Sequence, residues 1–228
     1  GRQRMLGDGE VSIQVSGISA DTAAGGVRMN MIPRDGGNRF SGDYKAAFRP
    51  GDWQSSNLTD RHVGRGLSAG NAIDRIFDTT LSVGGPIKRN KVWFFLTGRY
   101  FSVNNYIANT VQDDGSRGLD DQYIKSGLAR LTWQISSSNK LSAYFDEIDK
   151  YRGHDMQSNE DPETASLQWF SPAYHTAALK YTSTLSNAML FEAGYSRNLE
   201  YYTNSYRPDV GQPRFTPEWY ASASRLES

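Results

Sequence analysis

Apolar and polar residues alternate with a period of two along most of the chain, and helical spacing is rare. Between residues 39 and 48, Phe40 and Tyr44 fall on one face, whereas Asp43 and Lys45 fall on the other. Such alternation is typical of a β-strand with one apolar and one polar face. The pattern predicts seven strands, over residues 39–48, 77–84, 92–100, 126–135, 141–146, 176–182 and 189–196.

The connections between these strands differ in length in an ordered way. Short connections at 85–91, 136–140 and 183–188 alternate with long polar ones at 50–75, 104–121 and 152–172. In an antiparallel meander, this alternation puts all the short turns at one end of the sheet. Short turns on one side and long loops on the other are typical of a transmembrane β-barrel, whose strands of about ten residues cross the bilayer at a tilt. Soluble antiparallel sheets also alternate, so that alternative stays open.

The segment before the first strand follows a different pattern. Its apolar stretches at 11–15 and 27–32 are too short for barrel strands, and 34–38 has the Gly and Asp content of a tight turn. We therefore predict two parts: the tail of a small separate domain over residues 1–38, and the barrel portion over residues 39–228. The expected fold is all-β, a partial barrel of about seven strands that forms an open curved sheet.

Composition narrows the class of protein. The 228 residues carry 25 basic and 25 acidic side chains, and this balance argues against a nucleic-acid footprint. The absence of cysteine excludes a disulfide scaffold, a zinc–thiolate site and cysteine catalysis. No apolar run approaches the 18 residues of a membrane-spanning helix. The chain opens with Gly1 and has no leader, so we expect it to be a piece of a longer protein.

Candidate chemistry is sparse, and we expect neither an enzyme nor a bound metal or cofactor. Asp120 and Asp121 could attract Ca²⁺, but the EF-hand spacing is absent. His154 is expected to be solvated in a long loop, and the three histidines fit no metal motif. Glu147 and Asp149 lie on one face of a strand end. We interpret them as charges at the rim of the barrel, which is a simpler explanation than a catalytic pair.

Three aromatic residues are candidates for contact with a solute. Trp53, Trp169 and Phe170 are predicted to lie in the long loops, where exposed rings can stack on a ligand. Rings in such positions can equally attach a loop to the barrel or sit at a membrane rim, so both interpretations stay open.

Two stretches resemble a known family. The first reads GISADTAAGGVRMNMIPRDGGNRFSGDYKAAFRP, and it resembles the junction of plug and barrel in TonB-dependent outer-membrane receptors. That junction has a Gly-Gly pair, a short strand, a turn of the SGTN type and the start of the first barrel strand; here Gly37 stands in the place of Thr, and Ser41 in that of His. The second, VGGPIKRNKVWFFLTGRY, resembles the turn after the second barrel strand in the Oar-like branch of the family.

The resemblance implies a plugged barrel in the bacterial outer membrane that imports a scarce solute. Its partners would be outer-membrane lipid, a TonB-type energy-coupling protein and a small solute. Oar-like members often carry a carboxypeptidase-regulatory-like domain before the plug, and an adhesion or surface-structural role is an alternative for this branch. A soluble β-rich carbohydrate-binding module is the remaining alternative.

The resemblance also implies contacts between plug and barrel. We expect polar residues of the barrel interior to hold the plug through hydrogen bonds and ion pairs, because buried charges need partners. The candidate residues are Asp43, Lys45, Asp78 and Arg130 in the barrel, with Arg28 and Arg34 in the plug. The inner side of 92–96, apolar on both faces, is predicted to pack against the plug as well.

Overall fold

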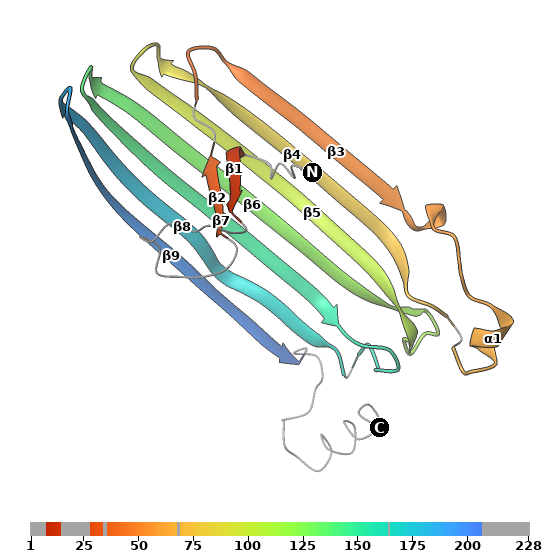
Figure 1. Ribbon diagram of the computed structural model, residues 1–228. Coiled ribbons are helices and arrows are strands. Elements are labelled where there is room, and N and C mark those ends of the chain that lie inside the picture. The colour runs from red at the N-terminus through yellow and green to blue at the C-terminus, as the bar shows by residue number, and fades with distance from the viewer. Residues whose placement is uncertain (1–7, 15–27, 34–35, 68, 164, 207–228) are drawn as a thin grey trace.

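The protein forms an open antiparallel sheet of seven strands that follow one another in chain order (Figure 1). A computed structural model describes residues 8–14, 28–33, 36–67, 69–163 and 165–206. The strands are β3 (Ser41–Pro50), β4 (Ala72–Lys88), β5 (Val92–Val111), β6 (Arg117–Ser136), β7 (Asn139–Asp155), β8 (Leu167–Ser186) and β9 (Met189–Tyr206). The predicted all-β fold, with seven meander strands in the arrangement of a partial barrel, is confirmed.

Two short strands precede the large sheet. β1 (Asp8–Gln14) pairs with β2 (Arg28–Pro33) in a separate two-stranded antiparallel sheet. The described part of the chain contains only two short helices, η1 (Gly51–Trp53) and α1 (Asp60–Val63), both between β3 and β4. No helix among the described residues has the length and apolar character needed to cross a bilayer.

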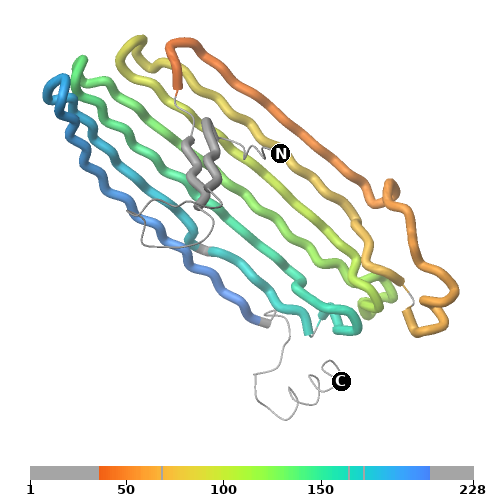
Figure 2. The backbone as a smooth tube through the Cα atoms, viewed as in Figure 1, coloured from red at the N-terminus to blue at the C-terminus, as the bar shows by residue number. Residues whose placement is uncertain are grey.

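The strands are longer than the alternation pattern predicted, reaching 17 to 20 residues in β4 to β9. The prediction of a long connection at 104–121 is wrong, because most of these residues extend β5 and β6 and leave a turn at 112–116. Both faces of that extension are largely polar, so alternation gave no signal there. The tube in Figure 2 shows the resulting long hairpins.

The connections are nevertheless sorted by length between the two ends of the sheet. At one end, called here the short-turn end, the connections are 89–91, 137–138 and 187–188. At the other, called here the long-loop end, they are 51–71, 112–116 and 156–166. This arrangement agrees with the predicted sorting.

The strand register assigns each residue to one of two faces, because residues directly opposite in neighbouring strands point the same way. One face carries apolar and aromatic side chains and is called here the apolar face; it includes Tyr44, Leu81, Leu96, Ala129, Phe145, Leu179 and Tyr195. The other, called here the polar face, includes Asp43, Lys45, Thr80, Ser82, Arg99, Arg130 and Thr132.

Burial on the two faces is the reverse of that in a soluble sheet. On the apolar face, Tyr44 is 67% and Tyr195 is 69% exposed, whereas Thr80 on the polar face is 2% exposed. Among the described residues, only Phe95, Ala108 and Met156 are buried hydrophobic side chains. Soluble proteins rarely expose a contiguous apolar surface of this extent.

Aromatic side chains border the apolar face at two levels. Towards the long-loop end, ring contacts run across four strands through Phe77, Tyr100, Tyr123 and Tyr151, with centroids 5.2–6.3 Å apart. Towards the short-turn end lies Trp133. About ten residues of β6 separate Tyr123 from Trp133, which is ~34 Å along a strand and ~26 Å along the barrel axis at a tilt of about 40°.

Candidate functional site

The two stretches that carry the resemblance meet at the short-turn end, in a group of contacts called here the junction clasp: Gly36, Asn38, Phe40, Asn90 and Trp93. The side-chain carbonyl of Asn38 accepts hydrogen bonds from the backbone N–H of Asn90 and from Trp93 Nε1–H, both at 2.8 Å. Asn38 Nδ2 donates to Asn90 Oδ1 at 2.6 Å. One side chain thus ties the segment entering β3 to the turn between β4 and β5.

The turn residue Asn90 has the backbone conformation that this contact requires. Its φ of 59° lies in the left-handed region, which asparagine tolerates better than most residues. This conformation closes the turn, in which Lys91 N–H donates to the carbonyl of Lys88 at 3.0 Å. The same turn therefore reverses the chain and presents the backbone N–H that Asn38 binds.

Glycines allow the entering segment to lie against the hairpin. A Cβ at Gly36 would lie 2.2 Å from the carbonyl oxygen of Phe94, and a Cβ at Gly85 would lie 2.3 Å from the ring of Phe40. A Cβ at Gly37, by contrast, would meet nothing within 4 Å. Gly36 is therefore needed for close approach, because its Cβ would meet backbone atoms. A Cβ at Gly85 would displace only the ring of Phe40, which is 71% exposed, and Gly37 is not needed for the approach.

On the inner side of 92–96, one residue contacts the segment that enters β3, and the predicted packing of this side against the plug stays a prediction. Trp93 binds Asn38, and Phe95 is buried, with its ring 3.0 Å from where a Cβ of Gly84 would lie. Contacts with the body of the expected plug lie outside the described side chains.

Three of the charged residues predicted to hold a plug, Asp43, Lys45 and Asp78, have ionic partners within the sheet. Asp78 receives two hydrogen bonds from Arg99, Nε to Oδ1 at 2.9 Å and Nη2 to Oδ2 at 2.8 Å. On the polar face, Lys45 Nζ lies 3.9 Å from Asp43 Oδ2, and the side chain of Lys45 is largely exposed. Arg130 lies on the same face, half-buried. The side chain of Arg28 and all of Arg34 lie outside the described residues, so the predicted plug contacts stay a prediction.

The sequence reasoning missed Arg99 as the partner of Asp78. The register places Asp78 opposite Phe101 and Arg99 opposite Thr80, so the ion pair is diagonal. The register shifts by one residue between Pro86 and Lys88. Counting outward from the turn at 89–91 would therefore have put these two side chains on opposite faces, and only the observed pairing makes them diagonal neighbours within reach of each other.

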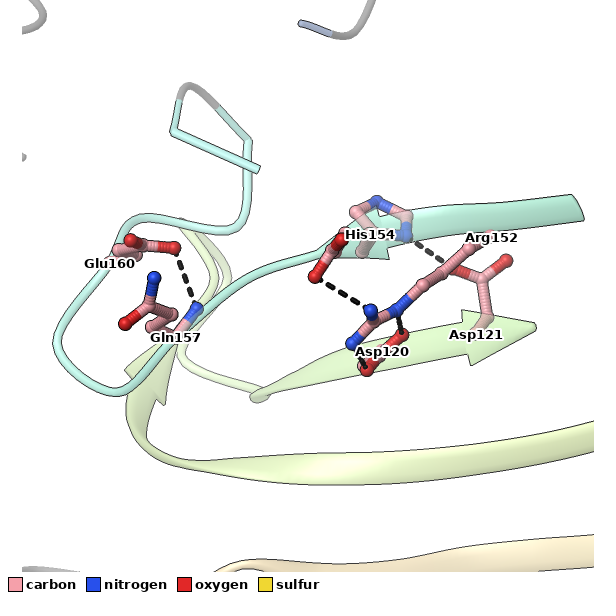
Figure 3. A network of polar contacts seen from close by, with 7 residues as sticks. Asp120, Asp121, Arg152, His154, Gln157 and Glu160 are labelled. Atoms are coloured by element: carbon pink, nitrogen blue, oxygen red, sulfur yellow. Dashed lines mark hydrogen bonds and ion pairs between the residues drawn. The ribbon is translucent and has the colours of Figure 1, made fainter. Parts of the chain in front are cut away.

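A network of ion pairs joins β6 and β7 near the long-loop end (Figure 3). Arg152 forms a two-point contact with the carboxylate of Asp120, whose side chain is only 3% exposed, and its Nη1 lies 2.8 Å from Asp155 Oδ1. His154 Nδ1 contacts Asp121 Oδ1. The sequence predicted that His154 is a solvated loop residue, and this prediction is wrong: His154 lies in β7 and has a carboxylate partner.

This network uses the carboxylates that sequence reasoning had weighed for Ca²⁺. The carboxylate of Asp120 is neutralised by the guanidinium of Arg152, which makes a charge-assisted, two-point contact with it. No group of three or more metal-ligating side chains occurs among the residues that the structure describes.

The connections at the long-loop end are joined by hydrogen bonds. Asn109 Nδ2 donates to the carbonyl of Gly66 and to Asn159 Oδ1, both at 3.1 Å. Arg117 Nη2 donates to the carbonyl of Gly70 at 2.7 Å. These bonds attach the connections 51–71 and 156–166 to the ends of β5 and β6, so the two longest loops are held at this end through the central strands.

The three aromatic candidates occupy different environments. Trp53 lies in η1 and is 73% exposed. Trp169 and Phe170 lie in β8, not in a loop as predicted, because β8 begins at Leu167. As neighbours in a strand they point to opposite faces: Phe170 pairs with Tyr151 of the apolar face, whereas Trp169 pairs with Arg152. They therefore cannot contact one ligand together.

Trp169 belongs to a cluster on the polar face that sequence reasoning missed. Its ring centroid lies 5.8 Å from that of Tyr202, and Lys150 Nζ lies 5.9 Å from Trp169 and 4.5 Å from Tyr174. An ammonium over aromatic faces is attracted by the ring quadrupoles. These residues come from three adjacent strands, so only their register places them together.

Part of the chain is similar to the TonB-dependent transporter Oar of Myxococcus xanthus. The identity is 30% over 104 residues, which cover 43% of this chain and 10% of Oar. No protein-family model matches the chain, and no solved structure matches it either. Because the match spans a tenth of Oar, the similarity supports an outer-membrane, receptor-like β-structure, and any activity of the whole protein is a proposal.

Proposed function

We propose that this chain is part of a plugged outer-membrane barrel of the TonB-dependent transporter type. Residues 1–38 would form the end of the plug, and residues 39–228 the first strands of the barrel. The observation that carries the proposal is the reversed burial of the sheet, with an exposed and mainly apolar face. Its aromatic residues Tyr123 and Trp133 lie ~26 Å apart along the barrel axis, close to the ≈25 Å apolar band of outer-membrane barrels. Towards the long-loop end, this face is interrupted by three charged side chains, Lys125, Glu147 and Asp149.

The position of the junction clasp supports the assignment of the two parts. A plug must connect to the first barrel strand without leaving the foot of the barrel, and Asn38 fixes that connection to the next hairpin. The reversed burial also argues against the soluble carbohydrate-binding module, because such a module would leave this apolar surface in water.

In the proposed mechanism, the chain performs transport and no covalent chemistry. The long-loop end and the polar-face cluster around Trp169 would receive a small solute, for which exposed rings and Lys150 offer stacking and charge. A TonB-type energy-coupling protein would act on the plug and open the lumen. The alternative adhesion role needs no such opening.

Channel conductance tests whether the segment before β3 closes the lumen, as a plug would. The whole protein should be non-conducting in a planar bilayer, and deletion of everything that precedes residue 36 should produce stable channels, because the lumen loses its plug. Equal conductance of the two proteins would argue that residues before 36 do not close a pore.

A further inference from the structure

The apolar face contains a hollow that the proposed transport function does not use. It has a volume of ≈680 Å³ and is lined by β4, β5, β6 and β7. Its rim is apolar and includes Leu81, Leu96 and Phe145, and its floor is formed by Gly98 and Gly127, which lie directly opposite each other. Each of the four strands has a paired neighbour on both sides, so the hollow does not depend on the open edges of the sheet.

Packing does not explain the two floor glycines. A Cβ at Gly127 would meet nothing within 4 Å, and a Cβ at Gly98 would meet only the carbonyl oxygen of Ser126 at 3.9 Å. Glycine in a strand interior is destabilising and often marks the close approach of a ligand. The two glycines therefore leave the floor of the hollow open to whatever lies against this face, at a cost in strand stability.

Charged side chains occupy one end of the hollow, just below the ring of Tyr123. Lys125 and Asp149 are directly paired across the strands, with Lys125 Nζ 3.9 Å from Asp149 Oδ2 and side-chain exposures of 54% and 49%. Glu147 is also exposed, stands opposite Gly127, and has no ion-pair partner among the described residues. Charges on the lipid side of a barrel are destabilising unless they are near the interface or have partners.

We infer that this hollow binds a single lipid with a zwitterionic aminoalkyl-phosphate headgroup. Its acyl chain would cover the glycine floor, its phosphate would meet Lys125, and its ammonium would meet Glu147 and Asp149. One cation and two carboxylates disfavour a purely anionic headgroup and match one that carries both charges. The inference rests on the proposed function, since only a barrel in a bilayer presents this face to lipid.

Native mass spectrometry of the whole protein, purified in mild detergent, tests the site. Phosphatidylethanolamine and phosphatidylglycerol are supplied in equal amounts; both have a phosphate, and only the first has an ammonium. We expect the protein to retain one phosphatidylethanolamine roughly tenfold more often than one phosphatidylglycerol. This ratio corresponds to the contribution of one charge-assisted hydrogen bond between the ammonium and a carboxylate. Glu147→Gln should reduce this preference, and Lys125→Gln should weaken retention of both lipids.

Filling the hollow provides a steric test with a matched control. Gly127→Leu should abolish retention of the lipid without disturbing the fold, because the added side chain enters empty space. Ala143→Leu adds apolar bulk to the same face outside the hollow, so retention should be unchanged.

Three results would overturn the inference: equal retention of the two lipids, undiminished retention by Gly127→Leu, or a protein partner recovered at the hollow in place of lipid. Each variant is first checked for insertion into liposomes. If insertion succeeds and lipid preference is absent, the site fails alone; if the parent protein does not insert, the proposed function fails as well.

Discussion

Removal of the Asn38 side chain should loosen the junction between the entering segment and the sheet. Asn38→Ala deletes three hydrogen bonds, to Asn90 N–H, Asn90 Oδ1 and Trp93 Nε1–H. A net intramolecular hydrogen bond contributes about 0.5–1.5 kcal/mol, and the clasp is open to water, which places each bond at the lower limit. The expected loss is therefore about 1.5 kcal/mol of local stability, without loss of the barrel itself.

Hydrogen exchange is the appropriate assay, because it reports local opening without requiring global unfolding. A loss of about 1.5 kcal/mol corresponds to roughly tenfold faster exchange of the Asn90 amide, seen in a peptide that covers residues 88–93. Asn38→Asp retains both acceptor bonds and loses only the Nδ2 donor, so its effect should be clearly smaller. An unchanged exchange rate in Asn38→Ala would refute the view that this side chain ties the two segments together.

Three further predictions concern other parts of the structure. Gly36→Ala should destabilise the junction by about 1–3 kcal/mol, since its Cβ would collide with the Phe94 carbonyl, whereas Gly37→Ala should be near neutral; exchange of the same peptide separates the two, and equal effects would contradict the close approach. Arg152→Ala should cost about 2–3 kcal/mol at the long-loop end, because it leaves the buried Asp120 carboxylate without its cation; faster exchange of residues 153–160 is expected, and exchange at the wild-type rate would argue against the network. Hydrogen bonds from Ser116 lower the pKa of the Asp114 carboxyl. The ionised Asp114 therefore stabilises the turn at 112–116 fully above the unfolded pKa, and this stabilisation is lost as the pH falls through the folded pKa. An NMR titration midpoint for Asp114 at or above the unfolded value of about 3.9 would contradict this prediction.

Sequence alternation predicted the strands well where the two faces of the sheet differ in chemistry. In β3, Tyr44 and Lys45 point to opposite faces, so the period of two is visible in the sequence. In the extension of β5 and β6 beyond residue 104, both faces are largely polar and the pattern disappears. The same absence of contrast put Trp169 and Phe170 in a loop, although they lie in β8.

The sites were harder to predict than the strands, because they depend on register. Asn38 and Asn90 are 52 residues apart, and nothing local to either residue indicates their contact. Both nevertheless lie in the stretches that resemble the receptor family, so the sequence marked the right segments without showing that they touch. Asp78 was selected for its charge, and its partner Arg99 follows only from the pairing of β4 with β5.

Spin-label accessibility along β6 tests the central claim, that the apolar face meets lipid, most directly. The chain has no cysteine, so single cysteines can be introduced one at a time from 123 to 133 in the reconstituted protein. Labels at odd-numbered positions such as Ala129 and Leu131 should be accessible to oxygen from the bilayer, and labels at even-numbered positions such as Leu128 and Arg130 should not. High accessibility to a water-soluble nickel reagent at the odd-numbered positions, or accessibility without a period of two, would contradict a membrane-facing apolar surface.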